Sequence, residues 1–141
     1  MTAEKIAEEF QKGFDCSQVV FSSYAEELGI SEEIANRVSA CFGGGMNRGE
    51  TCGAIAGALM VLGMKYGQFD EENMEQKNIM AAKREEFLRR FQEKYPSIVC
   101  KKLLNYDLTK PEEMEKILEE GLLMTFCPKL VKDVIGILEE I

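Results

Sequence analysis

The chain has 141 residues, of which 45% are hydrophobic, and it carries a formal net charge of −8. This length and composition predict one compact domain, residues 1–141, that buries roughly two thirds of the surface exposed by the unfolded chain. The negative charge argues against a nucleic-acid partner, because affinity for nucleic acid comes largely from clustered Lys and Arg.

Capping residues and glycines divide the first forty residues into three predicted helices. Thr, Asp and Ser favour helix starts because their side chains accept a hydrogen bond from a free backbone N–H, whereas glycine favours helix ends. The predicted starts and ends are Thr2 and Gly13, Asp15 and Gly29, and Ser31 and Cys41. Gln18 follows Asp15 by three residues and completes a capping box, which places Cys16 in the first turn of the second helix.

A run of three glycines at positions 43–45 predicts a loop, followed by a helix of small residues that ends near Gly67. Thr51 is the predicted N-cap of this helix, so Cys52 falls in its first turn. Free backbone N–H groups and the helix dipole stabilise a thiolate at that position. Cys52 is therefore a candidate redox thiol or ligand.

We expect the glycine loop to cover a cysteine pocket, with its backbone N–H groups hydrogen-bonding to thiolate or cluster sulfur. Glycine permits this approach because it has no side chain and tolerates positive φ. The predicted cofactor-binding residues are Gly43, Gly44, Gly45 and Gly53.

Four further helices are predicted in the second half of the chain. Their caps are Asp70 for the longest, which runs to about Lys94, Ser97 for residues 98–104, Thr109 for a helix ending at Gly121, and Cys127 for the last. Proline suits the first helical position, which is why Pro128 places Cys127 at a cap. No segment alternates polar and apolar residues as a strand does, so the predicted fold is all-α, a single-domain bundle of about six to eight helices.

Four of the five cysteines share one predicted placement. Cys16, Cys52, Cys100 and Cys127 each fall in the first turn, or at the cap, of a different helix. If these helix starts converge, their dipoles create an electropositive pocket suited to an anionic cluster, a metal ion or a reactive dithiol. Cys41 lies at a helix end and is expected to be absent from the group or peripheral to it.

The expected compartment and the missing residue types limit the chemistry. The charged first residues do not resemble a signal peptide, and no apolar stretch is long enough to span a membrane, so we expect a cytoplasmic protein with no membrane association. In a reducing compartment, an odd number of cysteines favours free, catalytic or metal-bound thiols. The lack of histidine excludes Cys-His catalysis and histidine-ligated zinc or haem within this chain.

Four blocks of the sequence carry a resemblance to a known family. They are FDCSQVVF around Cys16, GGGMNRGETCGAIAGALMVLGMKYG around Cys52, SIVCKKLL around Cys100, and CPKLV from Cys127. The chain resembles the redox-active proteins named for their C_GCAxxG_C_C arrangement, which are small helical proteins. The resemblance implies a redox role with these four cysteines as the functional, or catalytic, residues.

Several hypotheses fit the cysteines. The leading one is a redox protein in which Cys16, Cys52, Cys100 and Cys127 ligate an iron–sulfur cluster for electron transfer or act as exchanging thiols. The alternatives are a structural zinc site with the same four ligands, and a helical interaction module in which the cysteines are small buried hydrophobic residues. Whether the protein is an enzyme, such as an oxidoreductase, stays open.

The redox hypothesis also predicts a geometry and a partner. The sulfur atoms of Cys52, Cys100 and Cys127 are expected to lie close to one another or to a common ion, with Cys16 nearby. A redox partner protein is expected, and the glutamate-rich segments LEEG and ILEEI could present an acidic docking surface to it. The sequence leaves open whether the chain forms a homo-oligomer.

Overall fold

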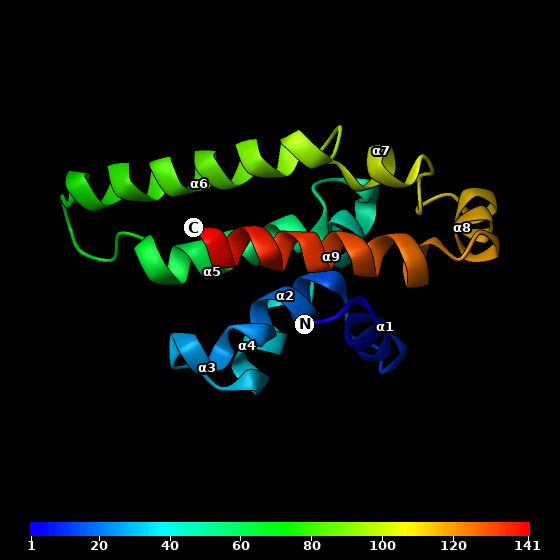
Figure 1. Cartoon of the computed structure of the whole chain (residues 1–141), viewed down its shortest axis with the longest axis horizontal. Coiled ribbons are helices and arrows are strands. Elements are labelled where there is room, and N and C mark those ends of the chain that lie inside the picture. The colour runs from blue at the N-terminus through cyan, green and yellow to red at the C-terminus, as the bar shows by residue number, and fades with distance from the viewer.

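The protein is all-helical in the computed structural model, which describes residues 1–141 (Figure 1). The helical elements are α1 (Ala3–Gln11), α2 (Cys16–Ser23), α3 (Ala25–Leu28), α4 (Glu32–Ser39), η1 (Gly45–Gly49), α5 (Gly53–Tyr66), α6 (Met74–Lys94), α7 (Cys100–Leu104), α8 (Pro111–Glu119) and α9 (Leu122–Glu140). The all-α prediction is confirmed. The structure has ten helical elements, more than the predicted six to eight, and seven of them have at least seven residues. One reason for the higher count is that a break at Tyr24 separates α2 from α3.

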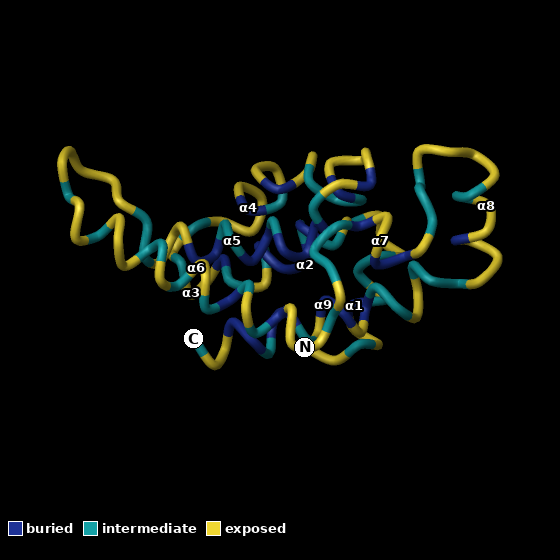
Figure 2. Tube along the Cα trace, turned by 90° about the horizontal axis from the view of Figure 1, so that it is seen from above, coloured by how far each residue is buried: buried dark blue, intermediate teal, exposed yellow.

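The helices pack around α5 and α9. Helices α5 and α6 form a long antiparallel hairpin, and α9 contacts both of them (Figure 1). Helix α2 packs against α5 and α9, while α1 and α4 extend this layer on the side away from α6. Helices α7 and α8 lie at one end of the molecule, where most residues of α8 are exposed (Figure 2). None of these helices combines the length and the apolar character needed to cross a bilayer.

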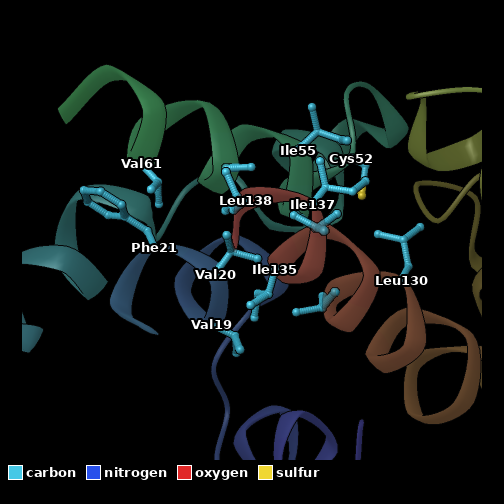
Figure 3. Close-up of a cluster of buried hydrophobic side chains, with 14 of the residues drawn as sticks. Val19, Val20, Phe21, Cys52, Ile55, Val61, Leu130, Ile135, Ile137 and Leu138 are labelled. Atoms are coloured by element: carbon cyan, nitrogen blue, oxygen red, sulfur yellow. The ribbon is translucent and has the colours of Figure 1, made fainter. Parts of the chain in front are cut away.

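The buried side chains form two separate clusters. The main core contains 21 buried residues, mostly from α2, α5, α6 and α9, and Cys52 lies at its edge (Figure 3). Gly57 allows α2 and α5 to approach closely, because a Cβ atom there would lie 2.8 Å from the carbonyl oxygen of Ser17. A second, smaller cluster consists of Cys100, Leu104 and Ile117, under α7 and α8.

Three predicted caps are confirmed. Thr2 accepts a hydrogen bond from the N–H of Lys5, and Ser31 accepts one from the N–H of Ile34. Asp15 begins α2 with the predicted capping box, in which its N–H donates to Oε1 of Gln18 over 2.9 Å.

Two predicted caps, Asp70 and Thr109, are wrong. Asn73, rather than Asp70, starts α6 by accepting a hydrogen bond from the N–H of Gln76. Thr109 does not cap α8, since its N–H and hydroxyl both donate to Asp107 and Lys110 occupies the N-cap position. Helix α8 then begins with Pro111 in its first turn.

The predicted starts of the cysteine-bearing helices are also displaced. Cys52 is itself the N-cap of α5, in place of Thr51. Val99 is the N-cap of α7, and the hydroxyl of Ser97 instead accepts a hydrogen bond from the N–H of Val99. Cys127 is not a cap, because α9 begins at Leu122 and continues through Pro128.

The continuation of α9 has a physical cause. Leu122, Leu123 and Phe126 pack against the second cluster, and this burial rewards helix formation before the proline. Proline lacks a backbone N–H and costs about 3 kcal/mol in a helix interior, so the sequence around Pro128 favours a helix that starts there. Packing of the preceding turn outweighs this cost and moves the start of α9 to Leu122.

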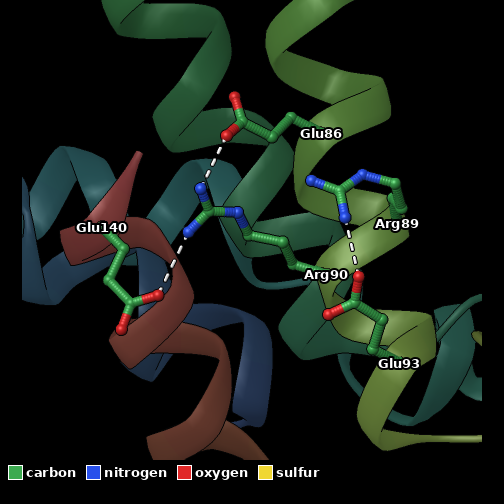
Figure 4. Close-up of polar contacts among 5 residues, drawn as sticks. All are labelled: Glu86, Arg89, Arg90, Glu93 and Glu140. Carbon is green, nitrogen blue, oxygen red and sulfur yellow. Dashed lines mark hydrogen bonds and ion pairs between the residues drawn. The ribbon is translucent and has the colours of Figure 1, made fainter.

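Helix α6 carries several Arg and Glu side chains that form ion pairs. Arg89 pairs with Glu93 on the same helix, whereas Arg90 pairs with Glu86 at 2.8 Å and with Glu140 of α9 at 3.1 Å (Figure 4). Arg90 therefore links α6 to the C-terminal end of α9.

Candidate functional site: a cysteine-lined pocket

A cavity of about 770 Å³ lies between the main core and the second cluster. It is lined by 22 residues, 17 of them hydrophobic, that come from α1, α2, the glycine loop, α5, α7, α8 and α9. All five cysteines are among them. The only charged residue in the lining is Asp15.

A short antiparallel contact brings Cys52 and Cys100 to this cavity. Thr51 and Val99 form an isolated β-bridge, the N–H of Cys52 donates to the carbonyl of Ile98 over 2.7 Å, and the N–H of Cys100 donates to the carbonyl of Glu50 over 2.6 Å. Two segments that lie far apart in the sequence are thereby fixed side by side, each immediately before a helix.

Gly53 places Cys16 next to Cys52. Cys16 is the first residue of α2, and a Cβ atom on Gly53 would overlap the Cys16 Sγ atom. Gly43 has a similar role in the loop, since its Cβ atom would overlap the side chain of Asp15. The lack of side chains at these two glycines lets the loop and the start of α5 close around the N-terminus of α2.

The glycine loop has an unusual backbone. Four consecutive residues, Gly44 to Asn47, have φ between 52° and 64°, and two of them, Met46 and Asn47, are not glycine. The turn η1 is therefore left-handed at this point, and a hydrogen bond from the N–H of Glu50 to the carbonyl of Gly45 closes it. Such backbone is costly for L-residues and is often found at functional sites.

The predicted glycines lie at different distances from the pocket. Gly43, Gly44 and Gly53 line it, and the backbone N–H of Gly44 faces the Cys16 thiol, where it offsets part of the rise in pKa that burial causes. Gly45 does not line the pocket, because it packs against the backbone of Glu50, where a Cβ atom would lie 2.5 Å from nitrogen. Binding of a cofactor by these residues stays a prediction.

Cys16, Cys52, Cys100 and Cys127 interact electrostatically as one group. Every pair among them contributes to the pKa of at least one member. Cys127 reaches the group from the second turn of α9 and interacts with the other three. Cys41 lines the cavity but is exposed and affects none of the four.

Burial controls the protonation of these thiols. It raises the pKa of Cys16 to about 12 and the pKa values of Cys52 and Cys100 to about 11, and it also raises the pKa of Cys127. The backbone N–H groups of Ala54 and Ile55 favour the Cys52 thiolate, but their effect is smaller. The N–H groups at the start of α5 thus favour the Cys52 thiolate as predicted, but desolvation in the apolar cavity outweighs them, so the pKa of the thiol is raised and not lowered.

The cysteines surround a cavity and do not converge on a point. No set of three or more Cys, Asp or Glu side chains is close enough to ligate a single ion. A zinc ion with four thiolates at about 2.3 Å would need all four sulfur atoms within about 4 Å of one another. An iron–sulfur cluster is several atoms wide, so its ligands stand farther apart around it.

One polar pair near the pocket has no local signal in the sequence. The hydroxyl of Tyr95 donates to Asp133 over 2.6 Å, and its ring stacks on Phe91 with centroids 4.8 Å apart. The charge of Cys52 contributes to the raised pKa of Tyr95, after burial and Asp133. Only the packing of α6 against α9 brings Tyr95 and Asp133 together, which is why the sequence did not indicate them.

One comparison with known proteins gives a match. A family model described as "Putative redox-active protein (C_GCAxxG_C_C)" matches residues 14–141, which include all five cysteines. No curated protein and no solved structure matches the chain.

Proposed function

Because the chain belongs to the C_GCAxxG_C_C family of redox-active proteins, we propose that its pocket holds an iron–sulfur cluster that transfers electrons. The proposed ligands are Cys16, Cys52, Cys100 and Cys127. Thiolates are the usual ligands of such clusters, and four of them satisfy either a two-iron or a four-iron form.

One observation carries this proposal. Four cysteines from four different helices line one cavity and interact with one another, whereas the fifth, Cys41, stays exposed at its edge. Their arrangement around a space suits a multi-atom cluster better than a single zinc ion.

The chain's own groups fit an anionic cluster. When bound, the cluster would accept and release electrons one at a time, and ligation would keep the thiols deprotonated despite their raised pKa values. The N–H groups of Gly44, Ala54 and Ile55 favour negative charge on sulfur. The apolar lining and these N–H groups would together set the reduction potential.

Anaerobic purification tests the proposal directly. The protein should be brown, with iron and acid-labile sulfide in a fixed ratio to the chain. Each of the variants Cys16→Ser, Cys52→Ser, Cys100→Ser and Cys127→Ser should lose most of its iron, whereas Cys41→Ser should retain it. Colourless protein that binds no iron on anaerobic reconstitution, or equal iron loss in all five variants, would show that the proposal is wrong.

A second candidate is thiol–disulfide exchange, favoured by the contact between Gly53 and the Cys16 sulfur beside Cys52. In that reaction one thiolate attacks a substrate disulfide, and the second thiol then closes a Cys16–Cys52 disulfide. The substrate leaves as two thiols, having taken up two electrons and two protons. An iron-free protein that loses two titratable thiols on reaction with a small disulfide, and keeps them in Cys16→Ser, would favour this candidate.

A further inference from the structure

We propose that the apolar part of the cysteine pocket binds an uncharged, apolar aromatic electron acceptor of the quinone class. This inference rests on the proposed redox function and names the substrate class of the same site. It concerns a defined part of the cavity, the apolar arm, which is lined by Phe10, Phe14, Leu108, Met114, Leu123 and Met124.

The size of the cavity supports a second occupant. A volume of about 770 Å³ falls in the range of small-molecule sites, which are typically apolar with a few polar groups. The cysteines come from the starts of α2, α5 and α7 and from the second turn of α9, while the apolar arm extends toward α1 and α8. Most side chains of the arm are only partly buried, and Met124 is 37% exposed, so the arm opens to solvent.

The charges around the cavity select against anions. No Lys or Arg lines it, and its one charged group, Asp15, is acidic. A phosphate or sulfonate group entering this lining would lose its water and gain no counter-ion. Phosphate-bearing carriers such as nicotinamide and flavin nucleotides therefore fit poorly, whereas a neutral ring system buries apolar surface at no such cost.

One polar side chain could orient the ring system. Asn47 lines the pocket from the left-handed turn, and its side-chain amide makes no hydrogen bond within the protein. Its NH₂ group is thus free to donate to a quinone carbonyl oxygen. The backbone strain at positions 46 and 47 acquires a role here, because it holds this amide at the pocket.

The reaction balances with groups already named. Each reduced cluster would give one electron, so two reduced molecules of the protein would in turn reduce one quinone, which takes up two protons from solvent at the open arm. Two reduced clusters, one quinone and two protons would thus give two oxidised clusters and one hydroquinone.

Two anthraquinones test the binding step without reacting with the thiols. They are 2-(hydroxymethyl)anthraquinone, which is uncharged, and anthraquinone-2-sulfonate, which is an anion of similar shape. Equilibrium dialysis of the anaerobically purified protein should give about tenfold tighter binding of the uncharged compound. Stopped-flow oxidation of the dithionite-reduced protein should show the same order of rates.

A matched pair of variants locates the site. Met124→Lys adds a cation at the arm and should improve the binding of the sulfonate. The ratio of the affinity for the uncharged compound to that for the sulfonate should therefore fall by about threefold or more. Met64→Lys makes the same change on α5, outside the pocket lining, at a methionine that is 48% exposed, and it should leave the ratio unchanged. Equal binding of the two compounds by the unmodified protein, or equal ratios in the two variants, overturns the inference.

The outcome is separable from that of the cluster proposal. Iron-loaded protein that shows no preference between the anthraquinones rejects only the acceptor class. Iron-free protein that shows the predicted preference supports the apolar arm as a binding site and rejects the cluster.

Discussion

Gly53 is the residue whose small size most directly shapes the cysteine pocket. The space that a side chain would occupy there is filled by the sulfur of Cys16, so even a methyl group must displace that cysteine. Helix α5 also contains Gly63, where an added Cβ would have no atom within 4 Å apart from the backbone of its own helix. The two positions share a helix and differ in what surrounds them.

This contrast gives a prediction for two alanine variants. Gly53→Ala should lower the free energy of unfolding by about 1–3 kcal/mol through overpacking, and it should reduce the bound iron. Gly63→Ala should be neutral or should stabilise the protein by about 0.5–1 kcal/mol, because alanine favours the helix, with iron unchanged. Urea unfolding and iron analysis measure both, and similar iron contents in the two variants would contradict the role assigned to Gly53.

The raised thiol pKa values predict how the stability of the iron-free protein depends on pH. Burial raises the pKa values of Cys16, Cys52 and Cys100 from 9.0 to between about 11 and about 12 in the folded chain. As pH rises above about 9, the unfolded chain loses these protons first, so the folded state binds more protons and becomes less stable. The free energy of unfolding, measured after chelation of metal, should fall between about pH 9 and pH 12. A flat profile for the unmodified protein, or an equal fall in Cys16→Ser, would contradict this assignment.

At the scale of elements, the ion pairs of α6 differ in what they connect. Arg89 and Glu93 belong to the same helix and are both largely exposed, whereas Arg90 is 30% exposed and also reaches Glu140 on α9. Exposed pairs within a helix contribute little, while a shared arginine between helices fixes their relative position.

Alanine substitution of these two arginines should separate the contributions. Arg90→Ala is expected to lower the free energy of unfolding by about 0.5–1.5 kcal/mol, with a smaller effect in high salt because ions screen the pairs. Arg89→Ala should change it by less than about 0.5 kcal/mol. Urea titrations at low and high salt test both values, and equal losses would mean that Arg90 does not link α6 to α9.

How much of each element could be predicted from the sequence depended on whether its signal was local. The capping box of Asp15 and Gln18 involves neighbours in sequence, so the position of Cys16 in α2 was predicted correctly. Pro128 is a typical first residue of a helix, but apolar packing of the preceding turn on the second cluster extends α9 past it. The bridge between Thr51 and Val99 joins segments nearly fifty residues apart and has no local signal.

The grouping of the cysteines could be suggested from their helix starts, but their raised pKa values depend on a cavity that only the fold creates.

At the scale of the whole molecule, the proposed ligands bridge two hydrophobic clusters of unequal size. Cys16 and Cys52 pack with the main core of 21 buried residues, whereas Cys100 and Cys127 pack with the second cluster, which has only three. So small a cluster contributes little to holding α7 and α8 in place. A cofactor ligated from both sides would fasten this end of the molecule to the rest.

Hydrogen exchange should reveal this coupling. Amides of residues 100–121 are expected to exchange at least several-fold faster in the iron-free protein than in the iron-loaded protein, while those of α5 change little. Cys41→Ser provides the control, because it should retain the difference between its loaded and iron-free forms. If exchange at residues 100–121 is the same in both forms, the cofactor does not fasten the second cluster.

The left-handed turn of residues 44–47 also has a consequence for the chirality of the chain. Glycine at positions 44 and 45 is achiral and has no preference between the two hands of backbone. Met46 and Asn47 are L-residues held in the conformation that their mirror images would favour, at about 1–2 kcal/mol each. At these two sites a D-amino acid would therefore fit the native backbone better than the encoded one, which reverses the rule for the right-handed helices that surround them.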